Sequence, residues 1–502
     1  MYKIKALIPQ SLKNLYHLAQ AVLANIIYGF PSHNIKVIGV TGTDGKTTTV
    51  QMITKIFQEA GKKVAMASTI NFVIDGVEEK NLSHFTTESA FALQKFISKA
   101  ASAGCEYLVL ETSSHSLDQH RVWGIEFQTA VITNITREHL DYHGTMEKYR
   151  EAKGKLFKSL KSNFKFSILN FQSIFNDKIL NNTKTSVVNF DMEYLDYFLN
   201  FDADKKYAFT CHSELDSESG FRVKPGMTTN GNIKIVQAEN IELNIGGSEF
   251  KIYNFLPQAY PREKFKINLP GLFNVENALA ATCVALGEGI GLETIKEALE
   301  KIRGVAGRME SVENTRGLNI LVDFALTPNA LERLYKLLVS VKKEDAKIIA
   351  VFGSCGDRDR GKRPIMGKMV SKYADIVILT NDEPYHEDPQ GIIDEIFAGV
   401  IGNHENKIDE SIINPNFQFP ISNFQSNPND QISKTKIGRV EGVNCFRILD
   451  RREAIAKALE IAKAGDIVCV TGMGNFESMV VGDKKIPWND KKVIQEELEK
   501  LI

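Results

Sequence analysis

The fold is decided by one stretch near the N-terminus, Gly39-Val-Thr-Gly-Thr-Asp-Gly-Lys-Thr-Thr-Thr-Val50. Before it, residues 35–40 form a β-branched run that is typical of a buried strand. After it, Val50, Ile53 and Ile56 recur at helical spacing. The stretch is therefore predicted to be a turn that joins a strand to a helix.

This turn has the composition of a phosphate-binding loop. Its glycines let backbone N–H groups approach phosphate oxygens at the positive end of the following helix. Lys46 would reach the terminal phosphates and the Thr47 hydroxyl would meet Mg²⁺. Val40 stands where the general P-loop pattern has its first glycine, so a glycine-rich turn with a solvated lysine is the alternative. The flanking strand and helix favour a nucleoside triphosphate, held by Gly42, Thr43, Asp44, Gly45, Lys46, Thr47 and Thr48.

Length and composition limit the class of protein. A chain of 502 residues is too long for one core, so two or three domains are expected. Its 61 basic and 62 acidic residues leave a net charge of −1, which does not suggest nucleic-acid binding. The six cysteines are far apart and form no C-x-x-C pair, which fits a reducing cytoplasm. No run of about 18 apolar residues predicts a membrane span.

The first segment, residues 1–36, is predicted to be short and helical. Residues 11–30 are apolar but are interrupted by Lys13, Asn14 and His17, so a packed amphipathic helix is expected rather than a signal peptide. A helix lying on a membrane surface is the alternative for the same residues.

The remainder is predicted to be α/β, with two domains. Strands and helices alternate over residues 37–307, which indicates a P-loop-type ATPase domain built on a parallel sheet. A Rossmann-like α/β domain follows over residues 308–502. Residues 211–230 are polar and aperiodic and are expected to be an insertion, and residues 411–436 to be a low-complexity loop.

Two polar clusters follow strands of the first domain. Glu111 ends a predicted strand and could hold Mg²⁺, because hard cations prefer oxygen ligands; a polar surface loop is the alternative. His139 and His143 lie four residues apart and precede Lys153 on the next predicted helix. Such a histidine pair can bind zinc, but the neighbouring oxygen ligands and phosphate loop favour Mg²⁺. By itself, Lys153 would be interpreted as a solvated lysine on a helix.

Two charged loops follow strands of the second domain. Residues 353–364 form a glycine-rich loop with four basic residues, which suits an anionic group. Residues 380–389 carry acids, which suit an ammonium group. Both loops could be charged surface turns, but their shared place at strand ends of one sheet favours a site.

Together these motifs resemble the Mur ligase family, and within it the muramoyl-tripeptide synthetases. Each motif is modest, but they occur jointly and in order from about residue 37 to the C-terminus. The matching stretches are Gly42-Thr-Asp-Gly-Lys-Thr-Thr48, Thr86-Thr-Glu88, Glu111-Thr-Ser-Ser-His115, Asn134-Ile-Thr-Arg-Glu-His-Leu-Asp-Tyr-His-Gly144, Gly271-Leu-Phe-Asn-Val-Glu-Asn277, Gly307-Arg-Met-Glu310, Gly356-Asp-Arg-Asp-Arg-Gly-Lys-Arg-Pro364 and Asp450-Arg-Arg-Glu-Ala-Ile455.

The resemblance implies an ATP-dependent amide ligase that works with Mg²⁺ at two sites. ATP would phosphorylate a carboxylate, and an amino group would attack the acyl phosphate. Lys46 and Mg²⁺ would stabilise the transferring phosphoryl group. By the family pattern, Thr47 and Glu111 would hold the first Mg²⁺, His139 the second, and Lys153 would be carbamylated.

The resemblance also assigns binding residues. Asn274 and Asn277 would face the adenine, and Arg308 and Asp323 would contact the ribose and phosphates. Arg358 would hold the carboxylate of the incoming amino acid, in a site with Asp382 and Glu383. The UDP-muramoyl-dipeptide would be held by Thr86, Thr87, Ser113, Gln119 and Arg121.

The chain departs from the family in several places, three of which concern its substrates. Residues 1–36 are short for the uridine-binding domain of the family. The Asp-Asn-Pro-Arg pattern that selects meso-diaminopimelate reads Asp382-Glu-Pro-Tyr385, so a phenol replaces an arginine that would pair with a second carboxylate. The usual Gly-Lys-Gly-His-Glu reads Gly472-Met-Gly-Asn-Phe-Glu477. The last two changes argue against meso-diaminopimelate as the amino acid added.

The expected function is therefore addition of an amino acid to a muramoyl-dipeptide acceptor in peptidoglycan synthesis, by a cytoplasmic monomer. Another ligase of the same architecture, of the folylpolyglutamate or cyanophycin type, is an alternative. A nucleotide-binding homologue without activity is a second alternative, which the joint presence of Lys46, Glu111, His139 and Lys153 disfavours.

Overall fold

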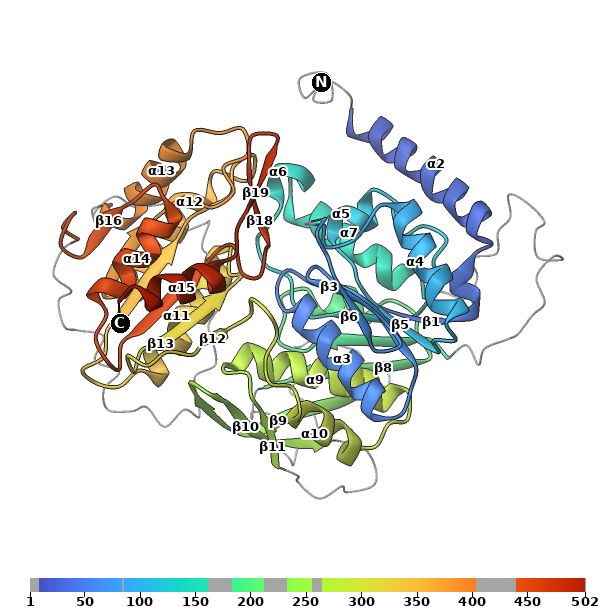
Figure 1. Ribbon diagram of the computed structural model, residues 1–502. Coiled ribbons are helices and arrows are strands. Elements are labelled where there is room, and N and C mark those ends of the chain that lie inside the picture. The colour runs from blue at the N-terminus through green and yellow to red at the C-terminus, as the bar shows by residue number, and fades with distance from the viewer. Residues whose placement is uncertain are drawn as a thin grey trace. The chain divides into compact units, whose positions relative to one another are not determined.

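The chain folds into two compact units (Figure 1). The structure, a computed structural model, describes residues 9–83, 85–160, 183–211, 233–254, 264–402 and 439–501. Unit 1 extends to Arg303 and unit 2 begins at Gly304. Most of the two stretches expected to be an insertion and a loop, 211–230 and 411–436, lies outside the described residues.

Unit 1 is built on an 11-stranded sheet. The seven strands from β9 to β2 run parallel, and two antiparallel strands extend the sheet at each edge. In spatial order the strands are β11 (Lys264–Ile267), β10 (Gly247–Asn254), β9 (Ile233–Asn244), β8 (Lys205–Thr210), β7 (Thr185–Asn189), β6 (Phe127–Ile132), β1 (Lys36–Thr41), β5 (Tyr107–Glu111), β2 (Val64–Ala67), β3 (Asn71–Ile74) and β4 (Val77–Lys80).

The register of the central strands positions the loops that follow them. β1 lies between β5 and β6, with Val40 opposite Glu111 and Thr41 opposite Ile132. The carboxyl ends of these three parallel strands therefore meet at one edge of the sheet, where α/β folds bind their ligands.

Both outermost strands of this sheet carry charge. All four residues of β4, Val77-Glu-Glu-Lys80, are exposed. In β11, Phe265 and Ile267 are buried, whereas Lys264 and Lys266 point to solvent.

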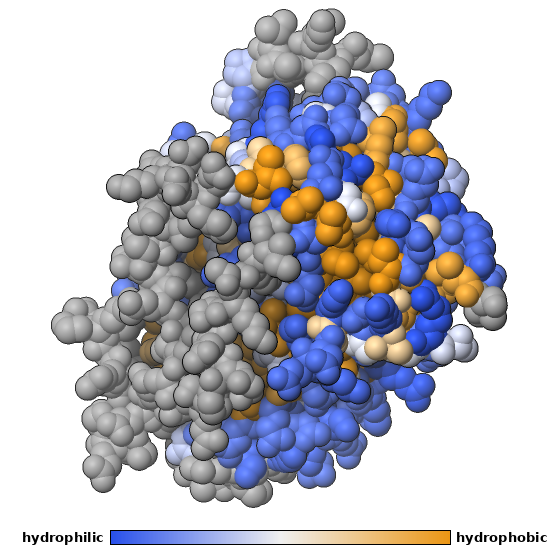
Figure 2. Space-filling view, turned by 90° about the vertical axis from the view of Figure 1, so that its left-hand side faces the viewer, coloured by the Kyte–Doolittle hydropathy of each residue, from blue (hydrophilic) through white to orange (hydrophobic). Residues whose placement is uncertain are grey.

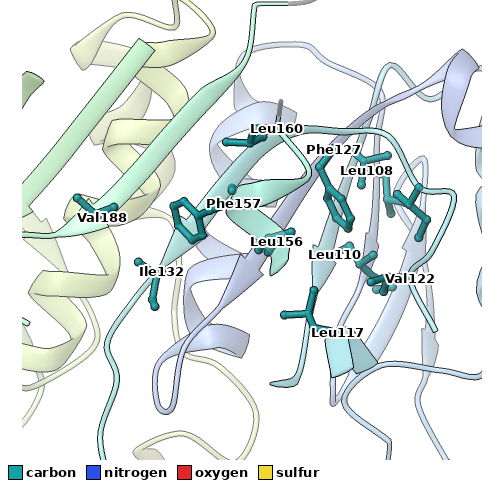
Figure 3. Close-up of a cluster of buried hydrophobic side chains, with 14 of the residues drawn as sticks. Leu108, Leu110, Leu117, Val122, Phe127, Ile132, Leu156, Phe157, Leu160 and Val188 are labelled. Carbon is teal, nitrogen blue, oxygen red and sulfur yellow. The ribbon is translucent and has the colours of Figure 1, made fainter. Parts of the chain in front are cut away.

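Helices cover both faces of the sheet. α3 (Lys46–Glu59), α9 (Leu272–Gly287) and α10 (Leu292–Glu300) pack on one another on one face. On the other face, α4 (Ala90–Ser102), α5 (Ser114–Asp118) and α7 (Met146–Lys158) enclose a buried apolar cluster with the strands. Figure 3 shows members of this cluster converging from strands and helices: Leu108, Leu110, Leu117, Val122, Phe127, Ile132, Leu156, Phe157, Leu160 and Val188. Three short helices complete the unit, η1 (Pro31–Asn34), α6 (Leu140–His143) and α8 (Leu195–Leu199).

The N-terminal helix α2 (Gln10–Tyr28) runs along the outside of unit 1 and packs on α4 (Figure 1). Its buried residues are Ala21, Ala24 and Asn25, and it ends at Gly29, whose φ of 66° is left-handed. No helix in the described part of the chain is long and apolar enough to cross a membrane.

Unit 2 has a six-stranded sheet, parallel except for its first strand. Its spatial order is β12 (Glu310–Val312), β13 (Asn319–Asp323), β17 (Ile467–Thr471), β14 (Ile348–Phe352), β15 (Ile376–Leu379) and β16 (Cys445–Arg447). A separate hairpin joins β18 (Ser478–Val481) to β19 (Lys484–Pro487).

Helices again cover this sheet on both faces. α11 (Pro328–Val341), α12 (Lys362–Tyr373) and α13 (Pro389–Ile401) pack side by side. α14 (Arg451–Ile461) and α15 (Asp490–Glu499) form an apolar core with the other face. Figure 2 views the molecule from the left-hand side of Figure 1. On the described part of this surface, apolar side chains lie in the middle and hydrophilic side chains lie around them.

The expected α/β class is confirmed, with a parallel P-loop-type sheet in one unit and a Rossmann-like sheet in the other. The sequence pattern did not predict the antiparallel strands β3, β4, β10 and β11. Residues 206–209 and 233–236, which flank the expected insertion, belong to the separate parallel neighbours β8 and β9.

Candidate functional site

The loop between β1 and α3 is a tight cradle that only glycine can form at two positions. Gly42 has φ of 150°, and a Cβ there would lie 1.9 Å from Thr133 Oγ1. Gly45 has φ of 81°, and a Cβ there would lie 2.3 Å from Asn277 Oδ1. Because Gly45 is the N-cap of α3, the first N–H groups of the helix open onto this loop, which is the arrangement that binds phosphate.

Two lysines meet at one carbonyl oxygen of this loop. Lys46 Nζ donates to Gly42 O at 3.1 Å and to Thr43 O at 2.7 Å. Lys153 Nζ, from α7, donates to the same Gly42 O at 2.6 Å and lies 4.4 Å from the centre of the Tyr149 ring. Lys153 is 1% exposed. Burial, with the positive charge of Lys46 as a second cause, holds the pKa of Lys153 well below its usual value.

Glu111 lies beside the loop at the end of β5. Thr47 Oγ1 is 3.1 Å from both carboxylate oxygens of Glu111. Thr69, just after β2, donates its N–H to Glu111 Oε2 at 2.8 Å and its hydroxyl to Oε1 at 2.9 Å. The carboxylate is buried and oriented by hydroxyl and amide donors, so its oxygens and that of Thr47 form one group of hard ligands.

The segment after β6 fixes the shape of the loop. Thr43 N donates to Asn134 O at 3.0 Å, and Asp44 N donates to Asn134 Oδ1 at 2.9 Å. Thr133 Oγ1 donates to Asp44 O at 2.5 Å. On the other side, Thr43 Oγ1 is 3.1 Å from the Tyr149 hydroxyl. Strand β6 and helix α7 therefore both hold the loop in place.

Three histidines gather next to this loop. The His139 ring lies 4.6 Å from that of His115, and the His115 ring lies 5.5 Å from that of His143. His143 is buried, with Nε2 3.0 Å from Ser114 Oγ, and burial lowers its pKa to about 4. In the described part of the chain, no group of three or more His, Cys, Asp or Glu side chains is arranged to hold a metal.

Three of the five residues expected to hold the acceptor, Thr87, Ser113 and Arg121, are joined by hydrogen bonds. Thr87 Oγ1 donates to Glu111 O at 2.9 Å and accepts from Ser113 N at 3.0 Å. Arg121 Nη1 donates to Thr87 O at 2.5 Å, and Gln119 lies two residues before it at the end of α5. Arg121 is largely buried, and burial lowers its pKa. Thr86 adjoins Thr87 and is half-buried.

Asn274 and Asn277 are buried at the start of α9, against the loop and α3. Asn277 Oδ1 is 3.2 Å from Thr49 Oγ1. Asn277 Nδ2 donates to Asn274 Oδ1 at 3.3 Å, and Asn274 Nδ2 donates to Pro270 O at 2.8 Å. The amides expected to meet an adenine thus also support the phosphate loop. Thr48, the last residue expected in the loop site, is buried on α3.

The remaining predicted residues belong to unit 2 and are described within it. Asp323 ends β13 and accepts from Met309 N and Ala325 N, both at 2.8 Å. The Arg308 guanidinium lies 4.7 Å from the centre of the Phe324 ring.

The loops after β14 and β15 bring Arg358 and the acidic residues together. The Arg358 guanidinium lies 5.2 Å from the Tyr385 ring, and the Tyr385 hydroxyl donates to Glu383 Oε2 at 3.3 Å. Asp382 is buried, and neither of its carboxylate oxygens has a hydrogen-bond partner among the described residues. Burial raises the pKa of Asp382 to about 7, although Arg451 acts in the opposite direction.

Sequence reasoning missed three residues that shape the site, Thr69, Thr133 and Tyr149. The first two directly follow parallel strands, so a search of every strand end would have found them. Tyr149 lies four residues before Lys153, which places both on one face of α7.

Comparison with known proteins shows which family this chain belongs to. The Mur ligase middle domain matches residues 40–221 and 172–285, and the Mur ligase glutamate ligase domain matches residues 307–416. A UDP-N-acetylmuramoyl-L-alanyl-D-glutamate–2,6-diaminopimelate ligase of Clostridium acetobutylicum is 34% identical over 96% of this chain and 82% of its own length. A UDP-N-acetylmuramyl-tripeptide synthetase of Roseiflexus sp. is 34% identical over 94% and 80%.

A solved structure of such a diaminopimelate ligase aligns with a TM-score of 0.52 and 28% identity, covering 93% of this chain and 79% of that one. This chain therefore belongs to the Mur ligase family, whose members are ATP-dependent ligases that form amide bonds and use Mg²⁺.

Proposed function

We propose that this chain joins an amino acid to UDP-N-acetylmuramoyl-L-alanyl-D-glutamate in peptidoglycan synthesis. One observation carries the proposal: Lys46 and Lys153 converge on the Gly42 carbonyl, beside the Thr47–Glu111 pair. A protein that only binds ATP needs Lys46 for the phosphates. It has no use for a second lysine, Lys153, that is buried beside the first. The names of the 34% identical relatives support the acceptor.

The loop fits the phosphates of ATP. The lack of a Cβ at Gly42 and Gly45, where one would overlap Thr133 and Asn277, allows the tight turn whose backbone N–H groups would face phosphate oxygens. Lys46 would exchange its two carbonyl acceptors for phosphate oxygens, and its charge would stabilise the transferring group. An acceptor carboxylate oxygen attacks the γ-phosphorus, and the bond to the bridging oxygen of ADP breaks. The amine of the amino acid then attacks the acyl carbon, phosphate leaves with the former bond electrons, and the nitrogen loses a proton.

The oxygen ligands fit Mg²⁺. This ion is usually held by one or two carboxylates together with phosphates and waters, so a cluster of three acidic or histidine side chains is not required. Thr47 and Glu111 would hold one ion, and His139 with carbamylated Lys153 a second. The bound ion supplies charge that neutralises the phosphoryl oxygens.

Carbamylation of Lys153 is supported by its surroundings. The nitrogen lone pair of a neutral amine forms the bond to the carbon of CO₂, and one proton is released. An ordinary lysine is protonated at neutral pH, whereas burial next to Lys46 favours the neutral form of Lys153. The product is an anion within reach of the loop, in place of an amine that burial disfavours in its charged form.

We further propose that the acceptor lies along Thr86, Thr87, Ser113, Gln119 and Arg121. The support is their grouping next to Glu111, together with the Arg121 guanidinium, whose Nε is buried without a hydrogen-bond partner among the described residues. An anionic substrate group would provide that partner.

The amino acid is proposed to carry no second carboxylate, although the named relatives take 2,6-diaminopimelate. Arg358 would hold its α-carboxylate. Around it, Tyr385 donates to Glu383, and the unpartnered oxygens of Asp382 would accept an ammonium group. A second carboxylate would face these acids without an arginine at position 385.

We also propose that the enzyme acts in the cytoplasm as a monomer. All six cysteines are free, four of them buried, which fits a reducing compartment. The elution mass in size-exclusion chromatography with light scattering checks the monomer.

The experiment that tests the function is phosphate release from ATP, with UDP-muramoyl-L-Ala-D-Glu and a panel that includes L-lysine, L-ornithine and meso-diaminopimelate. We expect one amino acid without a second carboxylate to stimulate release, with a product heavier than the acceptor by the mass of that amino acid less one water. No stimulation by any amino acid would overturn the proposal. Stimulation only with a folate acceptor and glutamate would instead identify the other ligase type.

A further inference from the structure

His386 lies between two aspartates that belong to different loops of unit 2. Its Nδ1 is 2.6 Å from Asp357 Oδ2, in the loop after β14, and its Nε2 is 3.3 Å from Asp483 Oδ1, in the turn between β18 and β19. Ionised carboxylates only accept hydrogen bonds, and a neutral imidazole carries a single N–H. A neutral His386 can therefore donate to one aspartate, whereas the imidazolium can donate to both. The complete bridge depends on the charge of this one side chain.

The Asp357 end of the bridge is fixed by a buried ion cluster. Asp357 N donates to Glu387 Oε1 at 2.6 Å. Arg363, whose side chain is 1% exposed, donates to both carboxylate oxygens of Glu387 at 2.9 Å and to Glu395 Oε2 at 2.7 Å. The φ of Asp357 is 51°, in the left-handed region that the surrounding structure has to support. The backbone that leads into Arg358 is thus held in place next to the bridge.

The Asp483 end belongs to a largely exposed hairpin. All four residues of β19 are exposed, and the Asp483 side chain is 97% exposed. The other strand, β18, lies along the segment that follows β15: Tyr385 N donates to Val480 O at 3.4 Å, and Val480 N donates to Glu383 Oε1 at 3.2 Å. The hairpin therefore contacts two of the residues that are proposed to surround the incoming amino acid.

The charges around His386 favour its protonated form. The hydrogen bond with Asp357, and after it the one with Asp483, raises the pKa of His386 above its usual value. On the segments that meet at the bridge, the other charged side chains next in sequence are Arg358, Glu387, Asp388 and Lys484. Below the raised pKa the imidazolium can bridge both aspartates. As the pH rises through that pKa, the ring loses one proton and one of its two donated hydrogen bonds.

We propose that protonated His386 is a positioning residue, which holds the hairpin of β18 and β19 against the loop of Arg358 and thereby shapes the site of the incoming amino acid. The inference rests on the proposed function for the ligand of this site, whereas the bridge itself is made by the chain's own residues. Loss of the bridge should raise the KM for the amino acid more than it changes kcat, because the bridge takes no part in phosphoryl transfer.

The first test needs no substrate. At about pH 6, hydrogen–deuterium exchange over residues 478–487 should be about twofold to fivefold faster in His386→Gln than in the native chain, which is the range for loss of one exposed ion pair. At about pH 9 the two proteins should exchange alike, because glutamine and neutral imidazole can each satisfy one aspartate. His386→Arg, which stays charged and has several donors, should keep the slow exchange at both pH values.

The second test is the KM for the amino acid that stimulates phosphate release. Taking the ratio of variant to native chain at each pH cancels the ionisation of the amino acid itself. For His386→Gln the ratio should be about two to five at about pH 6 and fall towards one at about pH 9. For His386→Arg it should be close to one at the lower pH and below one at the higher pH, where only arginine keeps the bridge.

His33→Gln is the matched control, because His33 is an exposed histidine that lies 3.9 Å from Glu126 in unit 1. It should change neither the exchange of residues 478–487 nor the KM. Equal exchange and equal KM for His386→Gln and the native chain at about pH 6 would overturn the proposal. A difference of the same size at both pH values would also overturn it, because the role would then not depend on charge. If no amino acid stimulates phosphate release, the proposed function fails, and the exchange measurement still decides whether the bridge exists.

Discussion

The surroundings of Lys153 do not stabilise the folded chain. A buried amine beside a second amine is unfavourable when charged, and its neutral contacts are a hydrogen bond to Gly42 O and the face of the Tyr149 ring. Residues kept at such a cost cluster at functional sites.

We expect Lys153→Met to abolish amide formation without lowering the melting temperature. Methionine fills similar volume and removes the buried amine, so the fold loses little. Phosphate release and thermal unfolding measure the two effects, and added bicarbonate should not restore activity. Lys158→Met, at an exposed site on the same helix, is the control and should leave both unchanged. Full activity of Lys153→Met would contradict the carbamate.

A second prediction concerns the side chain of the amino acid. Tyr385→Arg should raise kcat/KM for meso-diaminopimelate relative to the preferred amino acid by at least about tenfold, because a bidentate arginine–carboxylate pair is worth roughly 1.4 kcal/mol or more in a buried site. Competition assays between the two amino acids measure this ratio. Tyr385→Phe, which removes only the hydroxyl, should leave the preference in place. An unchanged ratio for the arginine variant would mean that residue 385 does not select the amino acid.

At the scale of elements, the phosphate loop depends on two strands and two helices that meet at one sheet edge. β1 delivers the loop, α3 begins at its last glycine, and β6 and α7 hold it through Thr133 and Tyr149. The loop is thus determined by tertiary contacts as well as by its own glycines.

Gly42→Ala should therefore impair nucleotide binding more than an ordinary glycine substitution. Its Cβ would overlap Thr133 Oγ1, so the loop must shift in addition to the strain of about 1 kcal/mol from positive φ. Calorimetric titration with ADP should show at least about tenfold weaker binding. Gly61→Ala, at φ 73° with open space around it, carries the strain alone and should bind ADP normally. Equal affinity of both variants would mean that the contact with Thr133 does not shape the loop.

Periodicity predicted buried parallel strands and long helices, and it missed the antiparallel strands near both edges of the large sheet. The strand predicted over residues 35–40 is β1, at Lys36–Thr41, and Val50, Ile53 and Ile56, whose spacing predicted a helix, lie on α3. Strands of four residues such as β3 and β4 have too few side chains to show alternation, and their pairing depends on a sheet already present.

For the site, motifs predicted Lys46, Glu111 and Lys153, but not their arrangement. That Lys153 meets the same carbonyl as Lys46 depends on the docking of α7 under β1, which no local pattern encodes. Thr69 carries no motif at all and acts only because β2 lies beside β5.

At the scale of the whole molecule, each unit has its own sheet and core, so each is expected to lose structure in its own transition. In unit 2, Arg451 and Asp490 form a buried bidentate pair with N–O distances of 2.8 and 2.7 Å, and Arg451 also donates to Thr471 O at 2.9 Å. This pair ties the start of α14 to α15 and β17.

Arg451→Met should destabilise unit 2 by about 3–5 kcal/mol, because it leaves the Asp490 charge buried and unpaired. In urea unfolding, the transition of unit 2 should move to a lower urea concentration. The transition of unit 1, which ADP should stabilise, should not move. Arg447→Met is the control, since its ion pairs with Glu441 and Asp394 are exposed and worth about 0–1 kcal/mol. A single transition that shifts as a whole would contradict independent units.

The charged outer strands of the 11-stranded sheet affect whether copies of this protein associate at high concentration. A sheet that does not close into a barrel leaves unpaired N–H and C=O groups at both ends, which invite strand addition by another chain. β4 presents Glu78, Glu79 and Lys80 at one end, and β11 presents Lys264 and Lys266 at the other. A chain adding to either end would have to desolvate these charges, so the sheet can be long without acting as a template for polymers.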